Sequence, residues 1–170
     1  MNIFIIISIF LYSIMSYDYN YDTYEKNNSL DTLLYPSSKH REQSKLIYQL
    51  LTKYHYKKIE VNDSLSEKIL DKYISSLDPN REYFFSSDIN YFNQYKKQMD
   101  DYVVSGYLEP AYEIFTVYHQ RVKDRISYVF KLLENEPDFS IEESLLFDRK
   151  ELDWFTDAQS MDDYWRKKIK

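Results

Sequence analysis

The sequence predicts an all-α protein, a helical bundle of about five to six helices preceded by a signal-like apolar segment. Three observations support this fold class. The 170 residues include one Gly and four Pro, too few for the frequent turns of a β-architecture. Beyond Pro36, apolar residues recur every three or four positions, which is the spacing of a buried helix face. Residue types that cap helices stand at the start of several of these runs.

The N-terminal segment is nearly continuous apolar sequence. Residues 3–15 are interrupted only by Ser8 and Ser13, and this run is shorter than the roughly 20 residues that cross a bilayer as a helix. We interpret residues 1–16 as a signal peptide, although no Lys or Arg precedes the run and no A-x-A-like site follows it. A retained anchor and a wrongly assigned start codon are the alternatives. Residues 17–36 are polar and aperiodic, which predicts a flexible lead-in.

Two helices are expected in the first half of the folded region. The first begins after Ser37 or Ser38, either of which suits the N-cap, and runs to about Tyr54. The second opens with Ser64 and Glu67 at the spacing of a capping box. The apolar faces comprise Leu46, Ile47, Leu50, Leu51 and Tyr54 in the first helix, and Leu65, Ile69, Tyr73 and Leu77, widened by Leu70 and Ile74, in the second.

The second helix is expected to stop at Asp78, Pro79 and Asn80. Pro79 disfavours the α conformation at Asp78, and Asp and Asn suit the turn that results. The bulky residues 83–85, Tyr-Phe-Phe, follow immediately. We expect them to dock as an aromatic plug onto the helix that has just ended.

The third and fourth helices flank Gly106, a residue type that favours the position just beyond a helix C-terminus. The third starts at Ser87 or Asp88 and presents Ile89, Phe92, Met99 and Val103. The fourth has Pro110 in its first turn and ends near Pro137. Its face is expected to be a buried seam rather than a cofactor site and comprises Ala111, Ile114, Phe115, Tyr118, Val122, Ile126, Val129 and Leu133.

The C-terminal segment carries a second capping-box spacing at Ser140 and Glu143, which predicts a short helix or turn. Trp154 and Phe155 are expected to anchor this segment. A last amphipathic helix begins near Ser160 and presents Met161, Tyr164, Trp165 and Ile169. The sequence stops at Lys170 within this pattern, without a capping residue. We therefore expect the folded region, residues 37–170, to be interrupted at Lys170.

No local motif for catalysis, metal binding or phosphate binding occurs in the sequence. There is no Cys, which excludes disulfides, thiolate nucleophiles and Cys-ligated zinc. His40, His55 and His119 are far apart and stand in no zinc or di-iron pattern, and a structural role is expected for His119. No G-x-S-x-G, S-x-x-K or glycine-rich phosphate loop is present. We predict no catalytic, cofactor-binding or metal-ligating residue and no cofactor, while a site assembled from spatially close Ser, Lys or His stays open.

Charge indicates no nucleic-acid partner. The net charge of −6 disfavours binding to phosphates, which need a basic face. Short basic runs at Lys57 and Lys58, at Lys96 and Lys97, and at residues 166–168 are interleaved with carboxylates. We expect them to be solvated helix faces.

A series of motifs follows in a fixed order along the folded region. The motifs, in order, are His55-Tyr56, Leu65-Ser66-Glu67-Lys68-Ile69, Leu77-Asp78-Pro79-Asn80-Arg81-Glu82-Tyr83-Phe84, Asp88-Ile89, Ala111-Tyr112-Glu113-Ile114-Phe115, Tyr118-His119-Gln120-Arg121-Val122, Phe147-Asp148-Arg149, Trp154 and Tyr164-Trp165-Arg166-Lys167-Lys168. This ordered series resembles the N-terminal domain of tail-specific proteases, the C-terminal processing family of serine peptidases. The likeness covers about residues 40–170.

The resemblance implies a protein of the bacterial periplasm whose family degrades or trims proteins from their C-terminus. In the family, a PDZ domain captures the apolar C-terminus of the substrate and a Ser nucleophile with a Lys general base cleaves it. Both modules lie C-terminal to the region matched here. None of the Ser or Lys residues present matches that dyad, so the sequence leaves open whether the chain is an enzyme, and we expect it to be inactive alone.

The resemblance also implies that the helical domain is a scaffold around the active site and a docking surface for an adaptor lipoprotein. Three hypotheses follow: the N-terminal domain of a protease cut off before its PDZ and catalytic domains, a stand-alone interaction module that binds the adaptor, and an unrelated helical bundle. The partners expected are protein substrates held through the PDZ domain and an adaptor lipoprotein. We expect no stable membrane span, a periplasmic location, and association with the inner membrane if the apolar segment is retained.

Overall fold

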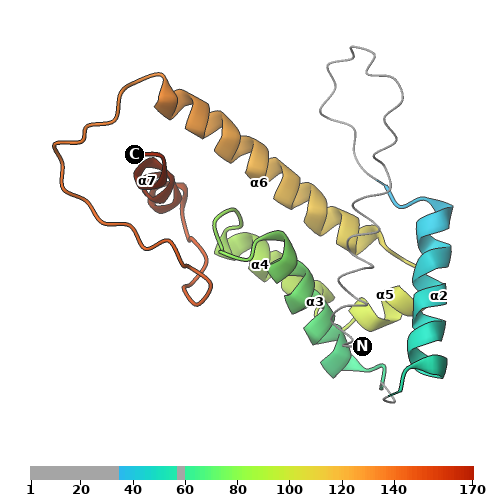
Figure 1. Ribbon diagram of the computed structural model, residues 1–170. Helices are drawn as coiled ribbons and strands as arrows, with labels where there is room; N and C mark the ends of the chain where they lie inside the picture. The colour runs from blue at the N-terminus through green and yellow to red at the C-terminus, as the bar shows by residue number, and fades with distance from the viewer. Residues whose placement is uncertain (1–34, 57–59) are drawn as a thin grey trace, which may run out of the picture. The chain divides into compact units, whose positions relative to one another are not determined.

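The computed structural model describes residues 35–56 and 60–170. Within these residues the chain forms six α-helices, one 3-10 helix and no strand (Figure 1). They are α2 (Ser38–Tyr54), α3 (Asp63–Leu77), α4 (Ser86–Phe92), η1 (Asn93–Tyr95), α5 (Met99–Ser105), α6 (Glu109–Leu133) and α7 (Ala158–Ile169). The predicted all-α fold is confirmed. The signal peptide predicted over 1–16 and most of the lead-in over 17–36 lie outside the described residues.

The first hydrophobic cluster joins α3, α4, α5 and α6. Its buried members are Leu70, Ile74, Leu77, Phe84, Phe92, Met99 and Ile114. Phe84 is fully buried, and its ring meets the ring of Phe92 edge-on with centroids 5.4 Å apart. The predicted docking of the aromatic plug is therefore confirmed for Phe84, and α3 buries Leu70, Ile74 and Leu77 against it.

A second cluster holds α7 against α6. Met161, Tyr164 and Trp165 are buried together with Phe155, and they pack on Tyr128, Val129 and Leu145, which are half-buried. The apolar face predicted for the last helix is confirmed at these three α7 positions. The helix begins at Ala158, slightly earlier than predicted, because the carboxylate of Asp157 accepts the amide of Ser160 at 2.8 Å and caps it.

Helix α2 packs against α5 (Figure 1). As predicted, Ser37 is its N-cap, and a reciprocal contact with His40 completes a capping box. The contact with α5 is made by a buried serine, because the hydroxyl of Ser44 donates to the carbonyl of Val103 at 2.9 Å. The predicted apolar face is largely not buried: Leu46, Leu50 and Tyr54 are exposed.

Two other predictions about helix boundaries were wrong. The N-cap of α3 is Asn62, whose side chain accepts the amide of Leu65, and not Ser64. The single helix predicted from Ser87 or Asp88 to Gly106 is divided into α4, η1 and α5. The division brings the amide of Met99 to the buried hydroxyl of Ser66, which accepts it at 2.7 Å. This tertiary bond fixes the start of α5, and it outweighs the local preference for a continuous helix.

Helix α6 begins with Pro110 in its first turn, as predicted. Its predicted buried seam is confirmed at Ile114 but is wrong toward the C-terminus, where Ile126 and Leu133 are exposed. The stretch between α6 and α7 contains no helix, so of the two alternatives at Ser140 only a turn is observed. Trp154 and Phe155 anchor the end of this stretch in the two clusters, as predicted.

Candidate functional site

The turn after α3 is organised by one carboxylate. Asp78 is buried and accepts three backbone amides, those of Glu82 at 2.8 Å, Tyr83 at 2.9 Å and Phe84 at 3.0 Å. Arg81 adopts a left-handed conformation with φ of 53° inside this turn. Burial raises the pKa of Asp78, and the three amide donors oppose that shift. In this turn the carboxylate of Asp78 takes the place of backbone carbonyls as the acceptor for three amides. The turn thereby places Phe84 in the core.

Glu82 connects this turn to α7. One of its carboxylate oxygens accepts the hydroxyl of Tyr164 at 2.6 Å, and the other accepts the ammonium of Lys168 at 2.6 Å. Its backbone carbonyl accepts the indole N–H of Trp165 at 3.1 Å. Burial alone would raise the pKa of Glu82, but the bonds from Lys168, Tyr164 and Asn80 outweigh it and lower the pKa. Glu82 is therefore a negatively charged anchor for the last helix.

A third segment joins the same place. Asn80 donates to the carbonyl of Phe147 at 2.7 Å and accepts the amide of Arg149 at 2.8 Å. The ring of Trp154 packs edge-on against Phe84, with centroids 5.9 Å apart. The Arg149 guanidinium lies 3.8 Å from the ring centroid of Phe155, a cation–π contact. We call the assembly of the turn 78–84, residues 147–155 and α7 the motif junction.

The motif junction brings together segments that are far apart in the sequence. Its contacts between Glu82 and α7 join residues 82 to 86 positions apart, and those of Asn80 join residues 67 and 69 positions apart. Sequence reasoning identified the motifs but not this convergence.

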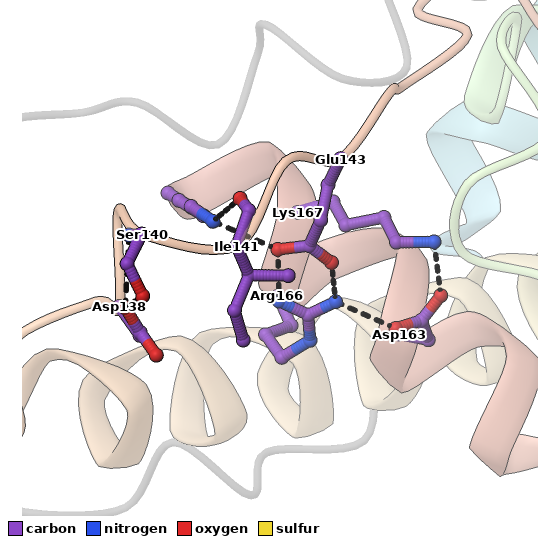
Figure 2. Close-up of polar contacts among 8 residues, drawn as sticks. Asp138, Ser140, Ile141, Glu143, Asp163, Arg166 and Lys167 are labelled. Atoms are coloured by element: carbon purple, nitrogen blue, oxygen red, sulfur yellow. Dashed lines mark hydrogen bonds and ion pairs between the residues drawn. The ribbon is translucent and has the colours of Figure 1, made fainter.

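A second charged network ties the segment between α6 and α7 to α7 (Figure 2). Glu143 accepts both terminal nitrogens of Arg166, one at 3.0 Å, and the ammonium of Lys170 at 2.9 Å. Asp163 binds Arg166 at 2.9 Å and Lys167 at 2.6 Å. The bonds from Arg166 and Lys170 lower the pKa of Glu143 to about 2. The basic run 166–168, expected to be a solvated face, instead holds carboxylates.

Further ion pairs join α6 to its neighbours. Arg121 forms a two-pronged pair with Asp88 at 2.9 and 2.8 Å, and Asp88 also accepts the amide of Phe85 at the start of α4. Arg125 pairs with Asp162 of α7. The planar guanidinium group of Arg has two N–H donors side by side, which suits it to two-pronged pairs with a carboxylate. These charged side chains therefore position helices.

The histidines occupy separate places. His40 Nδ1 accepts the amide of Ser37 at 3.3 Å and lies 2.8 Å from the hydroxyl of Tyr112. His119 is exposed and stacks on Phe115, with ring planes 10° apart. In the described residues, no group of three or more His, Asp or Glu side chains could hold a metal ion. Of the helices in residues 35–56 and 60–170, none has the length and apolar character needed to cross a membrane.

Two helices, α2 and α6, each expose a row of apolar side chains. On α6, Ile126, Phe130 and Leu133 are 51%, 66% and 60% exposed. On α2, the row is Leu46, Leu50 and Tyr54. Each row follows the three- or four-residue spacing of a single helix face. Contiguous exposed apolar side chains of this kind are typical of protein interaction sites.

Comparison with known proteins identifies the family. The family described as "Tail specific protease N-terminal domain" matches residues 47–170. The chain is 39% identical over 101 residues to the protein named Tail-specific protease of Haemophilus influenzae. That match covers 59% of this chain and spans 14% of the length of the relative. The chain therefore belongs to the tail-specific protease family, of which it carries the N-terminal domain.

Proposed function

We propose that this chain is the scaffold and docking domain of a periplasmic tail-specific serine endopeptidase and is inactive by itself. In this proposal the domain supports the PDZ and catalytic modules, which capture and cleave proteins at their C-terminal ends. The apolar N-terminal segment directs export, which places the domain in the periplasm.

The exposed apolar rows of α2 and α6 are the observation that supports this function best. A domain that worked alone would gain about 25 cal/mol for each Å² of apolar surface that it buried, yet Phe130 and Tyr54 are 66% and 78% exposed. The charged side chains of the motif junction, by contrast, are bonded within the domain. The exposed apolar rows leave surface for binding, and the charged side chains of the motif junction are used to hold the domain together. Both features support a scaffold function.

A two-part protease assay tests the proposal. The purified chain is mixed with a peptide that has an apolar C-terminus, first alone and then with the C-terminal part of the Haemophilus influenzae protease that follows the region matched here. We expect no cleavage by the chain alone and faster cleavage by the C-terminal part when the chain is added. Inhibitor-sensitive cleavage by the chain alone, or no effect of the chain on the C-terminal part, would contradict the proposal.

The alternative function is a stand-alone module that binds an adaptor lipoprotein. The second exposed row, on α2, favours a separate binding partner for that helix. A pull-down with purified periplasmic lipoproteins, using the chain and its Leu50→Glu variant, tests this alternative. Capture that the variant loses would support it, and failure to capture any lipoprotein would contradict it. The genomic sequence after Lys170 separates the two functions, because a PDZ and Ser-Lys domain in the continuing frame indicates the protease.

A further inference from the structure

The first part of the connection from α6 to α7 is open to solvent. Residues 134–142 contain no helix, and each of them is exposed. They contribute no side chain to either hydrophobic cluster of the described chain, and the side chain of Phe139 is 72% exposed. We call residues 134–142 the exposed connection. Burial of apolar surface therefore does little to fix its conformation.

Few hydrogen bonds hold the exposed connection. Inside it, the carboxylate of Asp138 accepts the amide and the hydroxyl of Ser140, at 2.9 and 2.6 Å (Figure 2). Within residues 35–56 and 60–170, one hydrogen bond joins it to a residue distant in the sequence, because the ammonium of Lys170 donates to the carbonyl of Ile141 at 2.7 Å. Since so few contacts are lost when it opens, this stretch can open without unfolding the rest of the domain.

The chain is held in place on both sides of the exposed connection. Before it, helix α6 continues to Leu133. After it, Glu143 accepts the side chains of Arg166 and Lys170, and Leu145 packs on the second cluster. Endopeptidases cut preferentially where an exposed backbone can leave its native conformation, and rarely within a stable helix. The exposed connection is therefore the part of this region that an endopeptidase can bind most easily.

We propose that the peptide bond between Phe139 and Ser140 is a proteolytic processing site, and that the domain stays assembled after the cut. The site suits an endopeptidase whose specificity pocket accepts an aromatic side chain, because the ring of Phe139 is open to solvent. Hydrolysis breaks the bond from the carbonyl carbon of Phe139 to the nitrogen of Ser140. Water supplies a hydroxyl to that carbon and a proton to that nitrogen. This inference does not depend on the scaffold function.

Contacts across the cut hold the two pieces together. Tyr164 and Lys168 each bond to the side chain of Glu82 at 2.6 Å, and the amide of Ser86 donates to the carbonyl of Phe155 at 2.8 Å. The second hydrophobic cluster also joins α7 to α6. None of these contacts involves the exposed connection. A cut therefore removes the covalent tether and leaves this interface in place.

Three exposed phenylalanines provide an internal comparison. Phe130, Phe139 and Phe147 are 66%, 72% and 64% exposed, but Phe130 lies within α6 and the carbonyl of Phe147 accepts Asn80 at 2.7 Å. The full chain is treated briefly with a small amount of chymotrypsin, which cuts after aromatic residues, and the fragments are identified by mass spectrometry. We expect the first cut within residues 60–170 to follow Phe139. A first cut after any other residue of that range overturns the site.

The variant Phe139→Ala should be cut within residues 60–170 about tenfold more slowly or less, because the pocket of the enzyme loses its aromatic side chain. The matched controls, Phe130→Ala and Phe147→Ala, should be cut as fast as the unaltered chain. Circular dichroism and the melting temperature establish that all three variants fold, as expected for changes at exposed positions. An unchanged rate for Phe139→Ala, or an equal slowing in a control, overturns the site.

Size-exclusion chromatography of the cut chain without denaturant tests whether the pieces stay together. We expect the piece that begins at Ser140 to elute with the rest of the domain and to separate from it only in urea. Circular dichroism should show the helix content of the uncut chain. Separate elution of that piece without denaturant overturns the continued assembly of the domain.

Discussion

The ammonium of Lys168 lies 2.6 Å from a carboxylate oxygen of Glu82, which stands 86 positions earlier in the sequence. The side chain of Glu82 is only 8% exposed, whereas that of Lys168 is 28% exposed. Removing the partner of a largely buried charge costs more than removing a surface pair, because the remaining charge is left poorly solvated. This contact should therefore contribute to the stability of the domain.

Replacement of Lys168 by methionine, which keeps the length of the side chain, should lower the free energy of unfolding by about 1–3 kcal/mol. The matched control is Lys150→Met, because Lys150 and its partner Asp148 are 63% and 69% exposed. An exposed pair contributes about 0–1 kcal/mol. Urea denaturation of both variants measures the difference. Equal losses in the two variants would show that the pair of Lys168 and Glu82 contributes no more to the free energy of unfolding than an exposed pair.

The stability of the domain should fall in acid, and Glu143 should account for part of that fall. Its pKa is about 2 in the folded chain, against an ordinary value of 4.5. Because the folded pKa is the lower one, the ionised group stabilises the fold above pH 4.5, and this contribution is lost as the pH falls from 4.5 toward 2. The Glu143→Gln variant should show a shallower decrease of melting temperature across that window. Identical pH profiles for the variant and the unaltered chain would refute the assignment.

Gly106 should not tolerate a side chain. It ends α5 with φ of 74°, and a Cβ atom there would lie 2.8 Å from the carbonyl oxygen of Arg41. We expect Gly106→Ala to destabilise the domain by about 1–3 kcal/mol, from the left-handed conformation and the close approach of α2 together. Ser105→Ala is the control, since Ser105 is exposed and such changes stay within about 0.5 kcal/mol. Thermal unfolding of both variants provides the comparison.

Two phenylalanines should differ sharply in their contribution to stability. Phe84 is fully buried in the first cluster, and Phe130 on α6 is 66% exposed. Phe84→Ala should cost about 3–5 kcal/mol through lost burial and the cavity that it leaves. Phe130→Ala should change the free energy of unfolding by about 0.5 kcal/mol or less. A melting temperature of Phe84→Ala equal to that of the unaltered chain would contradict the docking of the aromatic plug.

Features that depend on neighbouring residues could be predicted from the sequence. The cap at Ser37, the stop at Asp78 and Pro79, and the helix end at Gly106 each arise from the chemistry of a few adjacent residues. The start of α3 was misplaced because Asn62 and Ser64 are both good capping residues. Local preference alone does not choose between them.

Features that depend on distant partners could not be predicted. An apolar spacing identifies a helix face but not what covers it, so Ile114 and Ile126 look equivalent in the sequence although one is buried and the other exposed. The bond between Met99 and Ser66 that sets the start of α5 joins residues 33 positions apart. The motif junction, likewise, required the position of α7 relative to Glu82.

The long reach of the motif junction also affects the order in which the domain can fold. During synthesis, Glu82 and Phe84 leave the ribosome well before Trp154, Tyr164 and Lys168, which complete their surroundings. Until then a carboxylate and an aromatic ring that are buried in the finished domain lack part of their cover, and such exposed intermediates are prone to aggregate. We therefore expect α7 to dock late in folding, and we expect a nascent chain that lacks α7 to aggregate more readily than the finished domain.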